Sequence, residues 1–174
     1  MSGGSGGGSS GASGVSLTTK GDLLTFDTAE TRLPVGTNNQ VLTVNSAVAD
    51  GIEWNTKLES FVIACSDETS DLTTGTKVTF RVPYAFTVTS VRASLTTAAT
   101  GAIFVVDINE NGTTILSTKL SIDISETTST TAATPPVISD SSLADDSIIT
   151  IDIDTIGSTN SGQGLKVVII GYET

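Results

Sequence analysis

Alternation of apolar and polar side chains is the feature of this 174-residue sequence that most restricts its fold. Residues 77–82 place Val78 and Phe80 on one side and Thr79 on the other, and residues 149–154 alternate in the same way. A period of two is that of a β-strand with one buried face. No segment keeps an apolar period of 3.6 over two helical turns. The sequence therefore predicts an all-β fold.

Further strand and turn signals fill residues 58–174. Residues 103–108 and 165–170 are apolar on both faces, which is typical of central strands. The alternation slips near Ser90, which predicts a β-bulge. Asn111-Gly112 accepts the positive φ angles of a tight hairpin turn, after which residues 116–124 alternate again. Seven or eight strands at this spacing predict an antiparallel, jelly-roll-like β-sandwich over residues 58–174.

Composition narrows the classes of function. The net charge is −11, from 8 basic and 19 acidic residues, and no cluster of Lys and Arg offsets it. Such a surface repels phosphate backbones, so we expect no nucleic-acid partner. No run of eighteen apolar residues is present, so we expect no membrane insertion. The single cysteine, Cys65, follows an apolar run and is interpreted as a buried strand residue.

The sequence before the predicted sandwich has two parts. Residues 1–14 hold seven Gly and five Ser and predict a flexible arm. Residues 15–57 carry short apolar pieces between turn residues, each too short for an isolated sheet to be stable. Such a segment gains a core most easily by packing against copies of itself. The side chains expected at that contact are Leu23, Leu24, Phe26, Leu33, Val35, Val41, Leu42 and Trp54.

Three stretches of this segment carry a family resemblance. They read TTKGDLLTF over residues 18–26, TRLPVGTNNQVLT over residues 31–43, and GIEW over residues 51–54. In this order they resemble a module that recurs in phage tail-fibre and other virion proteins. Residues 61–172 also resemble terminal β-sandwich domains of structural proteins from marine and cyanobacterial phages. The resemblance implies a stalk-like, trimeric appendage on the surface of a phage particle.

The resemblance leads to two hypotheses about function. In the first, the chain is a non-enzymatic virion structural protein, a trimeric fibre or capsid decoration component whose N-terminal arm contacts other virion proteins. In the second, it is a receptor-binding tail-fibre protein that recognises a host surface polysaccharide. Tail fibres with this module commonly carry longer segments upstream of it than the 14-residue arm, and that difference favours a compact decoration or short fibre.

Side-chain chemistry offers few routes to catalysis. The sequence has no histidine, which removes the commonest general base and the commonest zinc ligand. Two carboxylates suffice for glycoside hydrolysis, and Asp152 with Asp154, or Asp145 with Asp146, are the candidate pairs. Alternation places the first pair on a solvated strand face. We therefore expect no catalytic residue and no cofactor.

A cation site is the remaining alternative. Asp140, Asp145 and Asp146 lie in one Asp/Ser-rich loop, and calcium prefers oxygen ligands. Their spacing does not match an EF-hand loop, and such loops more often cap their own backbone. The loop is therefore a weak calcium candidate.

Overall fold

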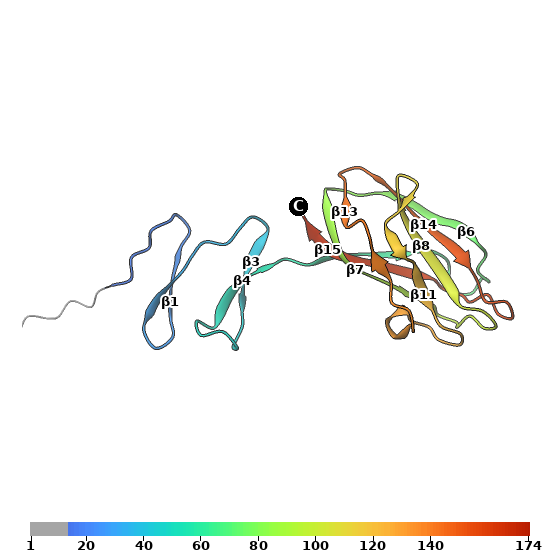
Figure 1. Ribbon diagram of the computed structural model, residues 1–174, viewed down its shortest axis with the longest axis horizontal. Coiled ribbons are helices and arrows are strands. Elements are labelled where there is room, and N and C mark those ends of the chain that lie inside the picture. The colour runs from blue at the N-terminus through green and yellow to red at the C-terminus, as the bar shows by residue number, and fades with distance from the viewer. Residues whose placement is uncertain (1–13) are drawn as a thin grey trace, which may run out of the picture. The chain divides into compact units, whose positions relative to one another are not determined.

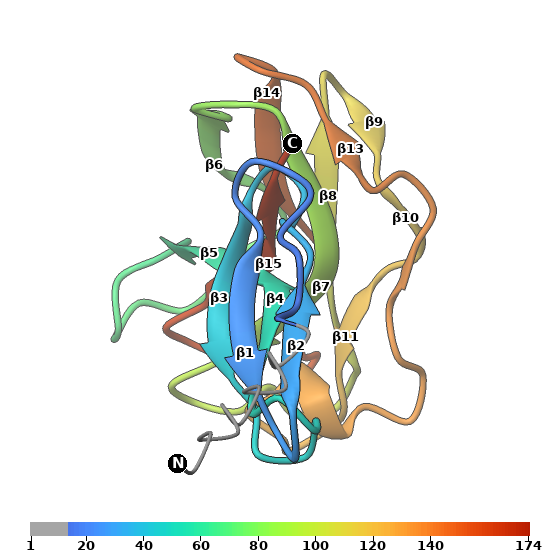
Figure 2. The same ribbon diagram turned by 90° about the vertical axis from the view of Figure 1, so that its left-hand side faces the viewer.

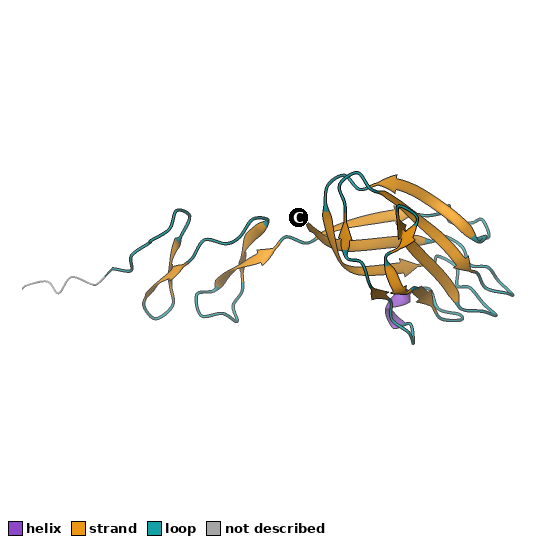
Figure 3. Cartoon of the chain, turned by 45° about the horizontal axis from the view of Figure 1, so that its top comes forward, coloured by secondary structure: helices purple, strands orange, loops and turns teal. Residues whose placement is uncertain are grey.

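The computed structural model describes residues 14–174, and the predicted Gly/Ser arm, Gly14 excepted, lies outside the described residues. The chain divides into two compact units, with the boundary between Lys57 and Leu58 (Figure 1). The described chain is all-β, as predicted. Its one helical element is a 3₁₀ turn at Ser129–Thr131 (Figure 3), and no helix between residues 14 and 174 is long and apolar enough to span a membrane.

The first unit consists of two antiparallel hairpins. Strand β1 (Leu23–Phe26) pairs with β2 (Glu30–Leu33), and β3 (Gln40–Val44) pairs with β4 (Ile52–Thr56). Each hairpin is a separate two-stranded sheet. A two-stranded sheet has no second layer of its own to cover its faces, so its stability depends on what packs against it.

The second unit contains eleven strands, all paired antiparallel (Figure 2). They are β5 (Glu59–Ala64), β6 (Gly75–Arg81), β7 (Phe86–Ser94), β8 (Phe104–Glu110), β9 (Thr113–Thr114), β10 (Leu116–Thr118), β11 (Leu120–Ile122), β12 (Val137–Ile138), β13 (Ser142–Leu143), β14 (Ile148–Thr155) and β15 (Lys166–Glu173).

Two of the sheets form a sandwich. One has the strand order β11-β8-β14-β6, with β9 attached to β8, and the other has the order β13-β7-β15-β5. A third, two-stranded sheet joins β10 to β12. Chain neighbours such as β6 and β7, or β14 and β15, lie in opposite sheets. This interleaving of eight strands into two four-stranded sheets is the arrangement of a jelly roll.

The core lies between the two sheets of the sandwich. Ile149, Ile151 and Ile153 of β14 are buried, as their alternation predicts, and Val167 and Ile169 of β15 are fully buried. Phe86 and Phe104 are the largest buried side chains. Every buried residue of this core cluster belongs to the second unit.

Local backbone features also follow the sequence. The register between β15 and β7 shifts where Ile170 pairs with Ser90 and Gly171 pairs with Val88, which confirms the predicted bulge. The β8–β9 turn has φ angles of 49° at Asn111 and 85° at Gly112, which confirms the tight hairpin. Cys65 is buried as predicted but lies one residue beyond the end of β5 instead of within a strand. Burial raises the pKa of its thiol to about 11, so it is not a reactive thiolate.

The alternating segment over residues 116–124 differs from its prediction. It does not form one strand, because the chain changes partner near Lys119: β10 pairs with β12, and β11 pairs with β8. Ile124 lies beyond β11 and is half-exposed, although its phase predicts burial. Several strands of two or three residues arise from such partner changes, which explains why eleven strands are present instead of seven or eight.

Candidate functional site

A buried aspartate organises the start of the first unit. The Asp22 side chain is 1% exposed and accepts hydrogen bonds from the backbone N–H groups of Thr18 (3.0 Å), Thr19 (2.8 Å) and Val35 (3.1 Å). Arg32 Nη1 lies 3.4 Å from its Oδ2. Burial by itself raises the pKa of Asp22, but the backbone N–H groups and Arg32 outweigh it and lower the pKa below its usual value.

Side-chain contacts also tie the two hairpins together. Thr31 Oγ1 donates to Asp50 Oδ1 (2.7 Å), and Trp54 Nε1 donates to the carbonyl oxygen of Pro34 (2.8 Å). A Cβ atom at Gly36 would lie 2.8 Å from the Trp54 ring, so only glycine permits this approach. These polar side chains therefore fix the shape of the first unit within a single chain.

The apolar side chains of the hairpins are largely left uncovered. Leu24 is 52% exposed and Phe26 is 69% exposed, and the β1–β2 register puts both on one face of the first hairpin. Val44 is 87% exposed and shares a face of the second hairpin with Leu42 and Trp54. The other residues expected at a contact between chains are exposed (Val35, Val41) or partly buried (Leu23, Leu33).

Val44 is the one strongly exposed residue of this surface that the sequence reasoning missed. It follows Leu42 by two positions in the same strand, so its phase alone places it on the same face. We call Leu24, Phe26, Leu42 and Val44 the hairpin surface. Large apolar side chains with this exposure make the hairpin surface a candidate contact site for another surface.

The weak calcium candidate does not gather in space. Asp146 Oδ2 lies 3.1 Å from Arg81 Nη1, and Asp140 Oδ1 accepts the Ser142 N–H at 3.2 Å, while Asp145 is exposed. Across residues 14–174, no three His, Cys, Asp or Glu side chains are placed to hold a metal ion. An arginine and a local turn already engage two of the three carboxylates, so the structure adds no support to this weak calcium candidate.

Each carboxylate of β14 belongs to its own network of polar side chains, and the first of these networks is centred on Lys119. Lys119 Nζ lies 2.8 Å from Asp107 Oδ2 and 2.5 Å from Asp154 Oδ2. Asp152 Oδ2 accepts hydrogen bonds from Asn109 Nδ2 (2.6 Å) and Thr150 Oγ1 (2.9 Å). Asp152 and Asp154, which the sequence offers as a pair, are therefore held by different partners.

Asp107 is the member of the Lys119 network that the sequence did not reveal. It lies within an apolar strand and is buried, and Thr114 Oγ1 donates to its Oδ1 at 2.5 Å. The hydrogen bond to Asp107, followed by that to Asp154, raises the pKa of Lys119 to about 12. Lys119 therefore stays charged and compensates a buried carboxylate, which is a stabilising role.

We expect Lys119→Met to destabilise the second unit by about 2 kcal/mol, because Asp107 then keeps a buried, unpaired charge. The cost is below that of a fully buried pair because the Lys119 side chain is 40% exposed. Since the folded pKa of about 12 exceeds the usual 10.5, the contribution is complete below pH 10.5 and disappears as the pH rises through 12. Urea unfolding across that range measures it.

The control for Lys119→Met adds Asp107→Asn, which removes the unpaired charge. The double variant should recover much of the free energy of unfolding that Lys119→Met loses. Between pH 10.5 and 12, its free energy of unfolding should change less than that of the unchanged chain. If Lys119→Met leaves the urea midpoint unchanged, the ion pair does not compensate Asp107.

A groove is the other candidate site of the second unit. It lies along β7 and opposite residues 135–138, and comprises two adjoining cavities of about 350 Å³ and 330 Å³. This size is at the lower end of the range for small-molecule sites. No sequence pattern indicated this groove, because its two walls are about forty residues apart in the chain.

The fold and these sites define an antiparallel jelly-roll protein with an N-terminal pair of apolar hairpins. A scan of protein-family models and searches of curated proteins and solved structures return no match to this chain.

Proposed function

We propose that this protein is a non-enzymatic structural component of a bacteriophage particle, a homotrimeric fibre or capsid decoration protein. Residues 15–57 form the contact between the three chains, and the jelly roll of residues 58–174 is the domain displayed on the particle surface. The motif resemblance of residues 18–54 supports the assignment to a virion, and the hairpin surface supports the self-association.

The exposed hairpin surface is the observation that carries the proposal. Asp22, Asp50 and Trp54 satisfy their polar groups inside one chain, so the first unit needs no partner for them. Phe26 and Val44, in contrast, leave most of their apolar surface in water. Packing three copies of the same unit around one axis covers these side chains and closes the assembly, so that no face remains open for further growth.

The jelly roll is compatible with either hypothesis about the particle. Domains of this architecture occur in viral capsids and in lectins, so they serve both as building material and as carbohydrate-binding modules. Architecture alone does not choose between these roles. The receptor-binding alternative has one specific observation in its favour, which is the groove along β7.

The mass of the full chain in solution tests self-association. We expect light scattering behind size exclusion to give three times 17.7 kDa, or about 53 kDa, at micromolar concentration. A folded monomer of 17.7 kDa under these conditions would contradict the proposal.

Location on the particle tests the virion assignment. An antibody against the second unit should label purified particles in electron micrographs. Label spread over the head supports a capsid decoration, and label confined to the tail supports the receptor-binding alternative. Absence of label on intact and on dissociated particles would overturn the virion assignment.

A further inference from the structure

The groove along β7 has one wall made by a strand and one made by a proline-rich segment. One cavity is lined by Thr89–Val91 together with Pro136, Val137 and Ile138. The second is lined by Ser90–Arg92 and by Ser129, Thr130, Pro135 and Pro136. Ser90, Val91 and Pro136 line both, so the cavities form one continuous groove.

The groove exists because the edge of β7 is covered at both ends and open between them. On one side, Val88 N–H donates to the carbonyl oxygen of Ser141 (2.7 Å), and β13 pairs with Phe86 and Thr87. On the other, Ala93 N–H donates to Ser129 Oγ (2.8 Å). Residues 89–92 form the open part of this edge, which is about 13 Å long at 3.3 Å per strand residue.

The backbone of Val91 faces this opening. Ala93 pairs with Val167 of β15, but its N–H points away from β15 to Ser129. Orientation alternates along an antiparallel strand, so Val91, two residues earlier, points its N–H and C=O the same way. A long peptide strand cannot add here, because segments of the chain close both ends of the open edge. A compact ligand fits these limits better.

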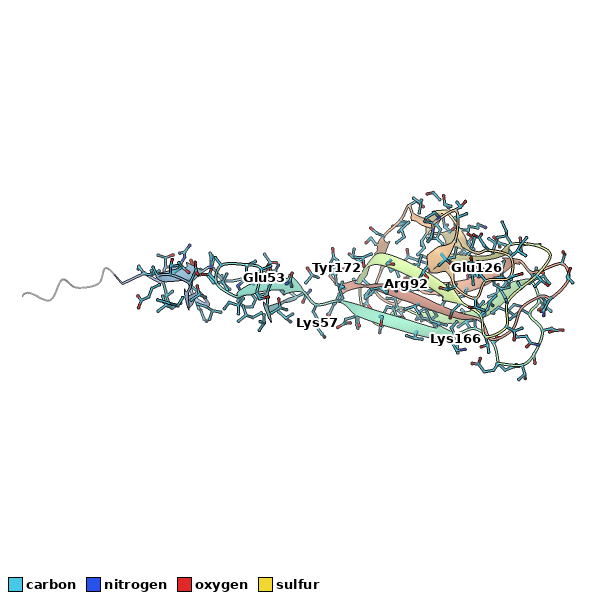
Figure 4. All side chains as sticks on the ribbon, turned by 90° about the horizontal axis from the view of Figure 1, so that it is seen from below. Glu53, Lys57, Arg92, Glu126, Lys166 and Tyr172 are labelled. Carbon is cyan, nitrogen blue, oxygen red and sulfur yellow. The ribbon has the colours of Figure 1, made fainter. Side chains whose placement is uncertain are left out.

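Arg92 gives the groove its charge. Its side chain is exposed and forms no hydrogen bond or ion pair with any residue between 14 and 174. By contrast, Arg81, Lys119 and Lys166 of the same unit each pair with a carboxylate. Figure 4 shows Arg92 on β7, beside β15, which carries Lys166 and Tyr172. None of the described residues lining the groove is acidic, although the chain carries 19 acidic residues.

The remaining lining suits a ligand rich in hydroxyl groups. The Ser90 hydroxyl can both donate and accept hydrogen bonds. Thr89 Oγ1 donates to the carbonyl oxygen of Ile170 (3.2 Å) and Thr130 Oγ1 is hydrogen-bonded to Thr128 Oγ1 (2.9 Å), and both oxygens keep a lone pair that can accept from a ligand. Pro135 and Pro136 offer an apolar wall against which the C–H face of a sugar ring can lie. An unpaired guanidinium beside them presents a fork of N–H donors that matches a carboxylate.

We propose that this groove binds an acidic saccharide, with the carboxylate of a uronic acid residue on Arg92 and ring hydroxyls on Thr89, Ser90 and Thr130. About 13 Å of open edge accommodates two or three sugar residues. The proposal deepens the receptor-binding alternative and rests on it for its biological setting. The chemistry of the groove involves the second unit alone.

The test uses the full chain and titrates it with trigalacturonic acid and, separately, with the neutral sugar maltotriose, by calorimetry and saturation-transfer NMR. We expect the acidic trisaccharide to bind at least tenfold more tightly than the neutral one. Arg92→Gln should weaken binding of the acidic trisaccharide at least tenfold, because the charge-assisted contact is lost. Arg81→Gln is the matched control, since Arg81 does not line the groove, and should leave binding unchanged.

Three results would overturn the proposal. They are no binding of the acidic trisaccharide at millimolar concentration, binding that Arg92→Gln does not weaken, and equally tight binding of a tetraglutamate peptide, which would show that charge alone is recognised. Unchanged melting temperatures of both Arg variants confirm that the fold is intact. A chain that binds the saccharide as a monomer would refute the proposed trimer and leave the groove assignment standing.

Discussion

The triple variant Leu24→Ser, Phe26→Ser, Val44→Ser should be a monomer at micromolar concentration. Burying one such side chain contributes about 1.5 kcal/mol at the low end, so nine of them in a trimer contribute on the order of 10 kcal/mol. Each step of about 1.4 kcal/mol is a factor of ten, so the association constant should fall by about seven orders of magnitude. Light scattering should report 17.7 kDa instead of about 53 kDa, three times that mass.

Val62→Ser is the matched control for this variant. Val62 lies on the outer face of β5 in the second unit and is 69% exposed, the same fraction as Phe26. If the contact between chains lies in the first unit, Val62→Ser leaves the mass unchanged. Dissociation by Val62→Ser, or a persistent trimer in the triple variant, would move the contact away from the hairpin surface. The second unit should keep its own unfolding transition in all variants, because its core is separate.

Gly171→Ala should destabilise the second unit by about 3 kcal/mol or prevent it from folding, because the added methyl overpacks the core. Gly171 lies in β15 at the bulge opposite Val88, where the two backbones approach closely. A Cβ there would lie 1.9 Å from the Thr87 carbonyl oxygen and 2.6 Å from the Phe86 ring. Neither can move aside, since Thr87 is paired backbone and Phe86 is fully buried.

Gly14→Ala provides the comparison for Gly171→Ala. A Cβ at Gly14 meets nothing within 4 Å, so its urea midpoint should match that of the unchanged chain. An unchanged midpoint for Gly171→Ala would show that β7 and β15 can separate at the bulge without loss of packing. Circular dichroism during urea unfolding measures both variants.

Local patterns correctly predicted the all-β character of the described residues. The alternation of Ile149, Ile151 and Ile153 identified β14, the phase slip near Ser90 identified the bulge, and Asn111-Gly112 identified the hairpin turn. These features depend on the period of side chains along one strand, or on φ angles that few residues accept. Both can be read from a few consecutive residues. The single strand predicted over residues 116–124 is wrong, because a change of strand partner does not alter the local alternation of side chains.

The candidate functional residues also divide into those that a local sequence pattern indicated and those that it did not. All eight residues expected at a contact between chains are at least partly exposed. Seven of them lie in the hairpin strands, and Val35 lies between the two hairpins. Val44 could have been added from its phase. For the weak calcium candidate, proximity in sequence did not show which partner each carboxylate has, since Asp146 pairs with Arg81, 65 residues away in the chain.

By itself, the sequence determined that the chain is all-β, which faces of its strands are apolar, and where its tight turns lie, because these depend on neighbours within a few residues. Only the tertiary structure decided the strand order of the jelly roll, the burial of Asp107 beside Lys119, and the groove beside Arg92. Each joins segments far apart in the chain. These contacts depend on how two whole sheets pack against each other. The alternation of side chains along one strand does not show which other strand or side chain it will contact.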